Sequence, residues 1–168
     1  ENHMISKGVK LYLGKGFAGT ENSGRTVLLN SGEKIQTDMV LMSIGVRPNN
    51  ELAKNAGLEL NPRGGIKVDE YQKTSDPNIY AVGDVIGVLD YVLGGETMIP
   101  LAGPANKQGR SVAANILGKK PEKYMGTMGT SVAKVFDMTV ATVGANEKTL
   151  ERLGKEYKKD YFVAIIHP

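Results

Sequence analysis

The stretch Thr74–Asp84, TSDPNIYAVGD, constrains the fold of this chain more than any other part of its sequence. Its first residues, Thr-Ser-Asp-Pro, are typical of a turn, and the apolar run Ile79–Val82 that follows has the length of a short buried strand. The run ends at Gly83, and the next side chain is the carboxylate of Asp84. We therefore expect a strand whose carboxyl end offers a ligand open backbone at the glycine and a negative charge.

The carboxyl edge of a strand is where nucleotides and cofactors bind in open α/β sheets. An ionised carboxylate there can accept hydrogen bonds from two hydroxyl groups of a sugar-like chain, each worth roughly 1.5–3 kcal/mol because one partner is charged. A Gly-Asp pair after a strand is also an ordinary turn or helix N-cap. The dipeptide by itself leaves both interpretations open.

The whole run is more specific than the dipeptide. It resembles the second FAD-binding motif of the pyridine nucleotide–disulfide oxidoreductase family, T-x-x-P-x-I-Y-A-x-G-D. The matching residues are Thr74, Pro77, Ile79, Tyr80, Ala81, Gly83 and Asp84. In that family the aspartate holds the ribityl chain of the flavin, so the resemblance implies that Asp84 binds FAD and that Gly83 lies beside it.

Two further segments carry the same resemblance. The segment DMVLMSIGVRPN, residues 38–49, resembles the passage from the NAD(P)H domain back into the FAD domain. The resemblance implies that Gly45 lies beside the nicotinamide nucleotide; the alternative interpretation is a glycine that only ends a strand. The segment IPLAGPANKQGR, residues 99–110, resembles the stretch that passes under the flavin and begins a helix aimed at the flavin ring.

The resemblance assigns roles within this second segment. It implies that Leu101, Ala102 and Gly103 contact the flavin and that Pro100 lies near the nicotinamide. A helix beginning near Pro104 would point its free N–H groups and positive dipole end at the ring. This helix and the sequence after it most resemble the branch of coenzyme A-disulfide reductases, NADH oxidases and persulfide reductases. Some members carry a histidine near the substrate where this chain has Asn106, so no substrate role is assigned to Asn106.

The predicted fold class is α/β with an α+β C-terminal part. The resemblance divides the chain into residues 1–48, the end of an NAD(P)H-binding domain; 49–120, the second half of a Rossmann-like FAD-binding domain; and 121–168, the start of a dimerisation domain. It therefore implies a homodimer formed through residues 121–168. The chain begins inside a predicted helix without an N-cap, so we expect a fragment whose first FAD fingerprint, redox cysteine and NAD(P)H fingerprint lie upstream of Glu1.

The remaining pattern predicts individual helices and strands. Helices are expected up to Gly8, at Glu51–Ala56, from about Pro104 to Leu117 with Ala105, Gly109, Val112 and Ile116 on its buried face, and at Glu147–Leu153 with Asn146 as its cap. Strands are expected at Val9–Leu13, Arg25–Leu29, Glu33–Gln36, Asp38–Gly45, about Leu60–Asp69, Gly129–Phe136, Thr139–Gly144 and Tyr157–Ile166. A loop is expected from Gly87 to Met98.

Gly14, Gly16 and Gly19 match the dinucleotide-binding pattern G-x-G-x-x-G. That motif requires a helix directly after the glycines, so that the helix N-terminus faces the pyrophosphate. Here the turn-forming residues TENSGR follow, and then another strand. We therefore interpret the three glycines as a connection between strands.

Composition excludes several classes of function. The chain has no cysteine, so it carries no disulfide, thiolate metal site or redox dithiol. His3 and His167 lie at opposite ends without a metal-ligand spacing, so no metal site is predicted. A net charge of +3 is too even to indicate nucleic-acid binding. No apolar run approaches the ~18 residues of a membrane span and no signal peptide opens the chain, so a cytoplasmic protein is expected.

Two hypotheses follow for function. In the first, the parent protein passes a hydride from NAD(P)H to FAD and then on to a disulfide, a persulfide or dioxygen, with no catalytic residue in this chain. In the second, the chain is a non-catalytic folded module that acts in dimerisation or scaffolding without bound flavin. For the isolated chain the second hypothesis is favoured, because the other half of the cofactor site is expected upstream.

Overall fold

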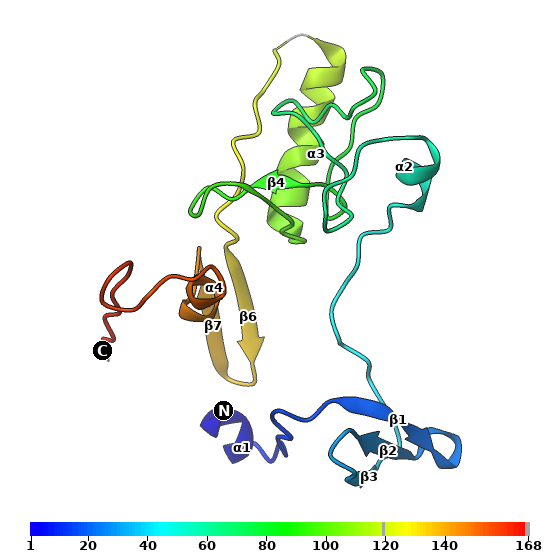
Figure 1. Ribbon diagram of the computed structural model, residues 1–168, viewed down its shortest axis with the longest axis vertical. Helices are drawn as coiled ribbons and strands as arrows, with labels where there is room; N and C mark the ends of the chain where they lie inside the picture. The colour runs from blue at the N-terminus through cyan, green and yellow to red at the C-terminus, as the bar shows by residue number, and fades with distance from the viewer. Residues whose placement is uncertain (119, 167–168) are drawn as a thin grey trace. The chain divides into compact units, whose positions relative to one another are not determined.

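The computed structural model describes residues 1–118 and 120–166 and contains mixed α and β elements in two compact units (Figure 1). Unit 1 comprises Glu1–Val46 and Val135–Met138, and unit 2 comprises the described residues of Arg47–Lys134 and Thr139–Pro168. His167, for which no metal-ligand role is predicted, lies outside the described residues. The assignment of residues 1–48, 49–120 and 121–168 to three family domains stays a prediction.

Unit 1 contains a short helix and an antiparallel three-stranded sheet in the order β1-β2-β3. Its elements are α1 (Asn2–Ser6), β1 (Phe17–Glu21), the 3-10 turn η1 (Asn22–Gly24), β2 (Thr26–Leu29) and β3 (Lys34–Gln36). Gly8 follows α1 with a φ of +86°, the left-handed conformation that ends helices. The predicted helix end at Gly8 and the strands at Arg25–Leu29 and Glu33–Gln36 are thereby confirmed to within a residue.

The strand predicted at Val9–Leu13 is wrong. The first strand of unit 1 is β1, and Gly19 within it pairs with Leu28 of β2. Residues 9–12 have the apolar alternation of a strand, but within the described chain no segment pairs with them. Backbone pairing, rather than the side-chain pattern, therefore decides where the sheet begins.

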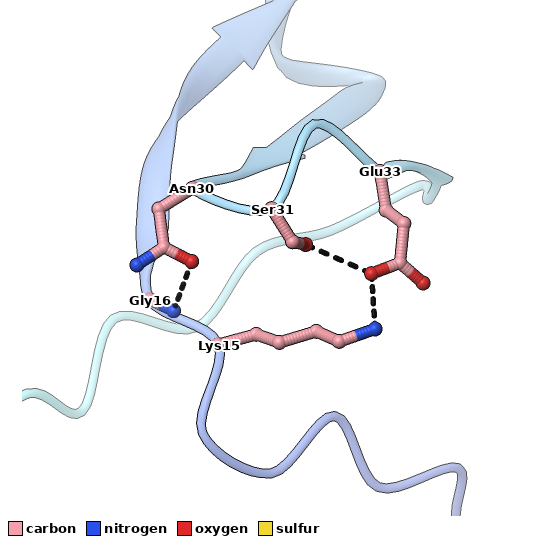
Figure 2. A network of polar contacts seen from close by, with 5 residues as sticks. All are labelled: Lys15, Gly16, Asn30, Ser31 and Glu33. Carbon is pink, nitrogen blue, oxygen red and sulfur yellow. Dashed lines mark hydrogen bonds and ion pairs between the residues drawn. The ribbon is translucent and has the colours of Figure 1, made fainter.

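The glycines that match the dinucleotide pattern belong to this sheet and its approach (Figure 2). The Gly16 N–H donates to Oδ1 of Asn30 at 2.9 Å, so it is not free to bind a phosphate. Beside it, the ammonium of Lys15 pairs with the carboxylate of Glu33, which also accepts from the Ser31 hydroxyl at 2.8 Å. No α-helix begins directly after the glycines, where β1, the 3-10 turn η1 and β2 follow, which agrees with their interpretation as part of a strand connection, except that Gly19 lies inside β1.

The buried strand predicted at Asp38–Gly45 is also wrong. Residues 39–50 form no regular structure, and Met39, Leu41 and Ile44 are 81, 85 and 82% exposed. A strand covered on both faces needs a neighbouring strand and two packed layers. Within the described residues nothing supplies them for this segment.

The hydrophobic core of unit 2 combines residues from both sides of Asp84 in the sequence. Ile86 is 1% exposed and clusters with Ile66, Val88 and Ala53. Ile66 and Ile86 form a parallel bridge, in which the Ile66 N–H donates to the Val85 carbonyl at 2.8 Å. Around this core lie α2 (Glu51–Asn55), β4 (Val88–Leu89) and β5 (Glu96–Thr97). The predicted helix at Glu51–Ala56 is confirmed. The segment Gly87–Met98, predicted as a loop, contains the short antiparallel pair β4–β5. The strand expected near Leu60–Asp69 is reduced to isolated bridges.

The turn of the opening motif is present, but its strand is not. The Asn78 N–H donates to the Asp76 carboxylate at 2.8 Å, as expected for a turn. In the predicted strand Ile79–Val82, only Tyr80 forms a bridge, with Lys73. The strand prediction is therefore wrong for the described chain, because a single bridge is too short to define a ladder.

Helix α3 (Ala102–Leu117) is the longest element, and it runs beside the loops that lead to and from the core of unit 2 (Figure 1). It ends at Gly118 in the left-handed conformation, φ 65°, as predicted. The predicted buried face is wrong: Ile116 is 60% exposed. Its place is taken by a polar face, whose buried residues are Gln108, Ser111 and Asn115.

The C-terminal part contains β6 (Ser131–Val135), β7 (Met138–Thr142) and α4 (Glu147–Arg152). The two strands form a two-stranded sheet, as predicted. Asn146 caps α4, since its Oδ1 accepts from the Thr149 N–H at 3.0 Å. The third strand predicted at Tyr157–Ile166 is wrong, because these residues hold only a Tyr157–Tyr161 bridge and turns.

Candidate functional site

An open groove of about 760 Å³ lies between Asp84 and the first two turns of α3 in unit 2. Asp84 is exposed on its rim, and the floor is a helix face of small residues at positions i, i+3 and i+7. The lining residues are Asp84, Ala102, Ala105, Asn106, Gly109 and Arg110. A Cβ added at Gly109 would meet nothing within 4 Å, so this face is open to a ligand.

The backbone before Asp84 is fixed from two sides. Gly83 has a φ of +89°, a conformation that side-chain-bearing residues rarely adopt. Its N–H donates to Oε1 of Gln108 on α3 at 2.7 Å, and its carbonyl accepts from the Ile86 N–H at 3.3 Å. Asp84 is therefore held between the helix and the hydrophobic core.

The N-terminus of α3 carries backbone N–H groups without a side-chain cap. Leu101 is the N-cap residue, with an extended backbone, and its apolar side chain makes no capping hydrogen bond. The first intrahelical bond runs from the Ala105 N–H to the Leu101 carbonyl at 3.1 Å. Pro104, third in the helix, has no N–H, so Ala102 and Gly103 carry the N–H groups that precede this bond. Together with the helix dipole they favour a polar or anionic partner.

A buried polar network, which was not predicted, attaches α3 to residues 71–72, just before the motif Thr74–Asp84. The Gln72 side chain, fully buried, donates to the Ser111 hydroxyl at 2.8 Å and accepts from Asn115 at 3.0 Å. Asn115 also contacts the carbonyls of Tyr71 and Glu122, and its Oδ1 accepts from the Glu122 N–H at 2.7 Å. The signal was the i, i+3, i+7 spacing of Gln108, Ser111 and Asn115, which places three polar side chains on one helix face.

A second attachment lies beside this network. Lys123 pairs with the Glu70 carboxylate at 2.6 Å and stands over the Tyr71 ring at 5.7 Å. The hydrogen bond to Glu70 and its negative charge raise the pKa of the Lys123 ammonium. The Tyr124 N–H donates to the Glu70 carbonyl at 2.7 Å. Residues 70–72 are thus tied both to α3 and to the segment that follows it.

The structure brings some of the predicted site residues together and separates others. Asp84 and Ala102 line the same groove, with Gly83 and Leu101 next to them in sequence. Gly103 lines a different cavity of about 330 Å³ with Tyr91 and Tyr124, and Pro100 a third of about 630 Å³ with Arg63 and Arg152. Gly45 belongs to unit 1, exposed, with a φ of +105°. The cofactor roles of all seven residues stay predictions.

The described residues, 1–118 and 120–166, offer no other obvious chemical centre. Among them no three or more His, Cys, Asp or Glu side chains are grouped as metal ligands are. In the same part of the chain no helix is both long and apolar enough to cross a membrane.

Comparison with known proteins decides the family. Residues 1–109 match the model of the pyridine nucleotide-disulphide oxidoreductases, a range that runs from the start of unit 1 through unit 2 to the middle of α3. The chain belongs to this family. The resemblance read from TSDPNIYAVGD is thereby confirmed.

Individual members of the family agree in sequence and in structure. An NAD(P)H sulfur oxidoreductase (CoA-dependent) of Pyrococcus furiosus is 33% identical over 141 residues, 84% of this chain and 32% of its own length. An NADH oxidase of Enterococcus faecalis is 32% identical over 165 residues, 96% of this chain and 36% of its own length. The crystal structure of reduced Bacillus anthracis CoADR-RHD superposes with a TM-score of 0.88 at 55% identity, covering 92% of this chain and 28% of that chain.

The chain spans about a third of the length of the curated relatives that it matches. Their names describe NADH oxidases and coenzyme A-dependent sulfur reductases, which agrees with the branch suggested by the sequence. The family relation is therefore established for this chain, whereas its cofactor site and the reaction of a whole protein are matters of proposal.

Proposed function

We propose that this chain forms the ribityl and ring end of an FAD site in an NAD(P)H-dependent flavoprotein oxidoreductase. The observation that carries the proposal is the groove that Asp84 lines together with the small residues at the start of α3. Residues 49–120 would then be the second half of a Rossmann-like FAD-binding domain, and residues 1–48 the end of the NAD(P)H-binding domain.

The groove suits the two chemically different ends of a flavin mononucleotide unit. Asp84 has two carboxylate oxygens, which can accept hydrogen bonds from neighbouring hydroxyls of a polyol chain. Ala102, Ala105 and Gly109 leave space for a flat ring, and the N–H groups of Ala102 and Gly103 can donate to its polar edge. Leu101 and Gly103 complete these contacts in the proposal, and Gly83 leaves the approach to Asp84 open.

When bound, FAD would supply the redox chemistry, accepting a hydride from NAD(P)H and passing electrons to a disulfide, a persulfide or dioxygen. The chain's own residues orient the cofactor and set the charge around it. The α3 dipole favours negative charge at the groove by up to ~2 kcal/mol. Gly45 and Pro100 are proposed to lie near the nicotinamide, where Gly45 has no side chain that could obstruct it.

The proposal is tested by titrating FMN into the purified chain and following the quenching of flavin fluorescence. Replacing Asp84 by Asn removes the charge while keeping the shape of the side chain. Losing one or two charge-assisted hydrogen bonds at roughly 1.5–3 kcal/mol should raise the Kd for FMN by at least tenfold. Glu59→Gln is the matched control, because Glu59 lies in the same unit and its pair with Lys67, at 3.5 Å, is exposed.

Equal FMN affinity in D84N and in the wild type contradicts the proposal. The same titration decides the second candidate function, a module that binds no flavin. FMN quenching that stays linear with concentration, as for simple collisions, would favour that candidate over a flavin site.

The second candidate rests on the C-terminal strand pair. Every residue of β7 is exposed, and Val132 and Val140 on the two strands are 67 and 42% exposed. Exposed β-branched residues on a two-stranded sheet favour association with another surface. We therefore propose that residues 121–168 contribute to a homodimer. Sedimentation equilibrium of the wild type and of Val140→Lys should show a dimer that the charge weakens, and a monomer for both would overturn this proposal.

A further inference from the structure

We propose that Gln108 is a positioning residue, which sets the place of the Asp84 carboxylate through a hydrogen bond to Gly83. The inference rests on the proposed flavin site, because it concerns how that site is kept in shape. Gln108 does not line the groove itself. It acts on the backbone next to the residue that does.

The bond is short and partly buried. The Gly83 N–H donates to Oε1 of Gln108 at 2.7 Å, and the Gln108 side chain is among the largest that are almost fully buried, at 2% exposure. Because a backbone N–H can only donate, the oxygen Oε1 of the Gln108 amide, and not its NH2 group, must face the Gly83 N–H. Loss of this acceptor leaves a partly buried N–H without this partner, which costs stability.

Helix α3 carries both sides of the arrangement. The N–H groups of Ala102 and Gly103 stand at its start, and Gln108 follows in its second turn, about 9 Å along the axis from Ala102 at 1.5 Å per residue. One rigid helix thus presents the groove floor and also grips the residue before Asp84. Within the described residues, Gln108 makes the hydrogen bond that joins α3 to Gly83–Asp84.

Gly83 makes this contact necessary. Its φ of +89° gives it access to backbone conformations that other residues avoid, and a Cβ added there would meet nothing within 4 Å. No packed atoms therefore hold Gly83 on the side where a Cβ would lie. Ser111 and Asn115 of α3 also form hydrogen bonds with the side chain of Gln72, but Gln72 lies eleven residues before Gly83 in the chain. Without Gln108, the nearest backbone hydrogen bonds that hold this segment are the one from the Ile86 N–H to the Gly83 carbonyl at 3.3 Å and the one from the Ala81 N–H to the Gln72 carbonyl at 3.0 Å.

The first variant is Gln108→Met, which keeps the length of the side chain and removes its acceptor. Gln108→Glu is the rescue variant, because a carboxylate oxygen can again accept from the Gly83 N–H. Ser111→Ala is the matched control: it removes a buried hydroxyl on the same helix face, which accepts from Gln72 and donates to the Gln108 carbonyl at 3.2 Å, and leaves the bond between the Gln108 side chain and Gly83 in place. Urea unfolding of each variant shows that the flavin measurements are made on folded protein.

The flavin readout is a double-mutant cycle with Asp84→Asn, using FMN as the probe. If Gln108 acts through Asp84, Q108M raises the Kd for FMN about tenfold in the wild-type background and less than threefold in the D84N background. Q108E should recover most of the lost affinity, and S111A should change it less than threefold. Equal losses in both backgrounds would mean that Gln108 serves stability in general, and would overturn the inference.

The second readout needs no flavin. Hydrogen exchange of the Gly83 amide, followed by NMR, should become at least tenfold faster in Q108M and remain near the wild-type rate in S111A. An unchanged Gly83 rate in Q108M overturns the inference whatever the flavin titration shows. If Gly83 is released in Q108M but D84N binds FMN as tightly as the wild type, the proposed flavin site fails while the positioning of Gly83 by Gln108 stands.

Discussion

The polar network around Asn115 gives the most exacting test of how α3 is attached in unit 2. We predict that Asn115→Ala destabilises the unit by about 2–4 kcal/mol, because roughly three net hydrogen bonds of ~1 kcal/mol each are lost and the buried partners are left unpaired. Those partners are the Tyr71 carbonyl, Gln72 Oε1 and both backbone groups of Glu122, and Asn115 itself is 8% exposed. Helix propensity acts in the other direction, since Ala favours a helix over Asn by roughly 0.5 kcal/mol.

Asn106→Ala controls for that propensity. Asn106 lies on the same helix, is exposed, and makes a side-chain bond only to the Ala102 carbonyl at 2.9 Å. The difference between the two variants therefore isolates the network. Urea unfolding followed by circular dichroism at ~222 nm, to which α3 contributes as the longest described helix, should show the midpoint of N115A lower by about 1–2 M. Midpoints of N115A and N106A within error of each other would refute the reasoning that buried polar contacts dock α3.

Two further predictions concern the sheet of unit 1 and the core of unit 2. The hydrogen bonds from Lys15 and Ser31 lower the pKa of the Glu33 carboxyl. The stability that these hydrogen bonds add is therefore fully present above the ordinary pKa of a glutamate, and it is lost as the pH falls through the lowered pKa of Glu33. A carboxyl ¹³C titration should show the Glu33 pKa rising in Lys15→Met but not in Lys34→Met, since Lys34 pairs with Glu21, and no difference would contradict the assignment. Ile86→Ala should lower the free energy of unfolding in urea by about 2–5 kcal/mol, because Ile86 is 1% exposed. The control Ile116→Ala should lower it by less than ~0.5 kcal/mol, because Ile116 is 60% exposed. Similar losses of stability in the two variants would contradict the assigned core.

The short local signals were the ones that the sequence predicted well. Gly8 and Gly118 end helices, Asn146 begins one, and the turn at Asp76–Pro77 is present. Each depends on the backbone freedom of glycine or on one side chain binding a nearby N–H, so a few neighbouring residues suffice to predict it.

The strands failed where pairing depends on distant backbone. Asp38–Gly45 and Ile79–Val82 have the apolar runs of buried parallel strands, yet neither forms one in the described chain. A run of apolar residues defines a strand only when neighbouring strands accept its hydrogen bonds, and a pattern contains no information on whether they are present. The same holds for Val9–Leu13 and Tyr157–Ile166.

The site was predicted in part. The sequence indicated Asp84 and the start of α3 as the two elements of one site, and they line one groove. It missed Gln108, because interpreting the helix by its apolar residues directed attention to Ala105, Gly109, Val112 and Ile116. A buried face of Gln, Ser and Asn is chosen by specific partners on another segment, and no helix pattern identifies those partners.

The most direct test of the central claim is a crystal structure of the chain with FMN bound. In that structure a ribityl hydroxyl oxygen should lie about 2.5–3.0 Å from a carboxylate oxygen of Asp84, as in an O–H···O hydrogen bond, with the ring towards the N–H groups of Ala102 and Gly103. Flavin bound elsewhere on the chain, or bound in this groove without contact to Asp84, would contradict it.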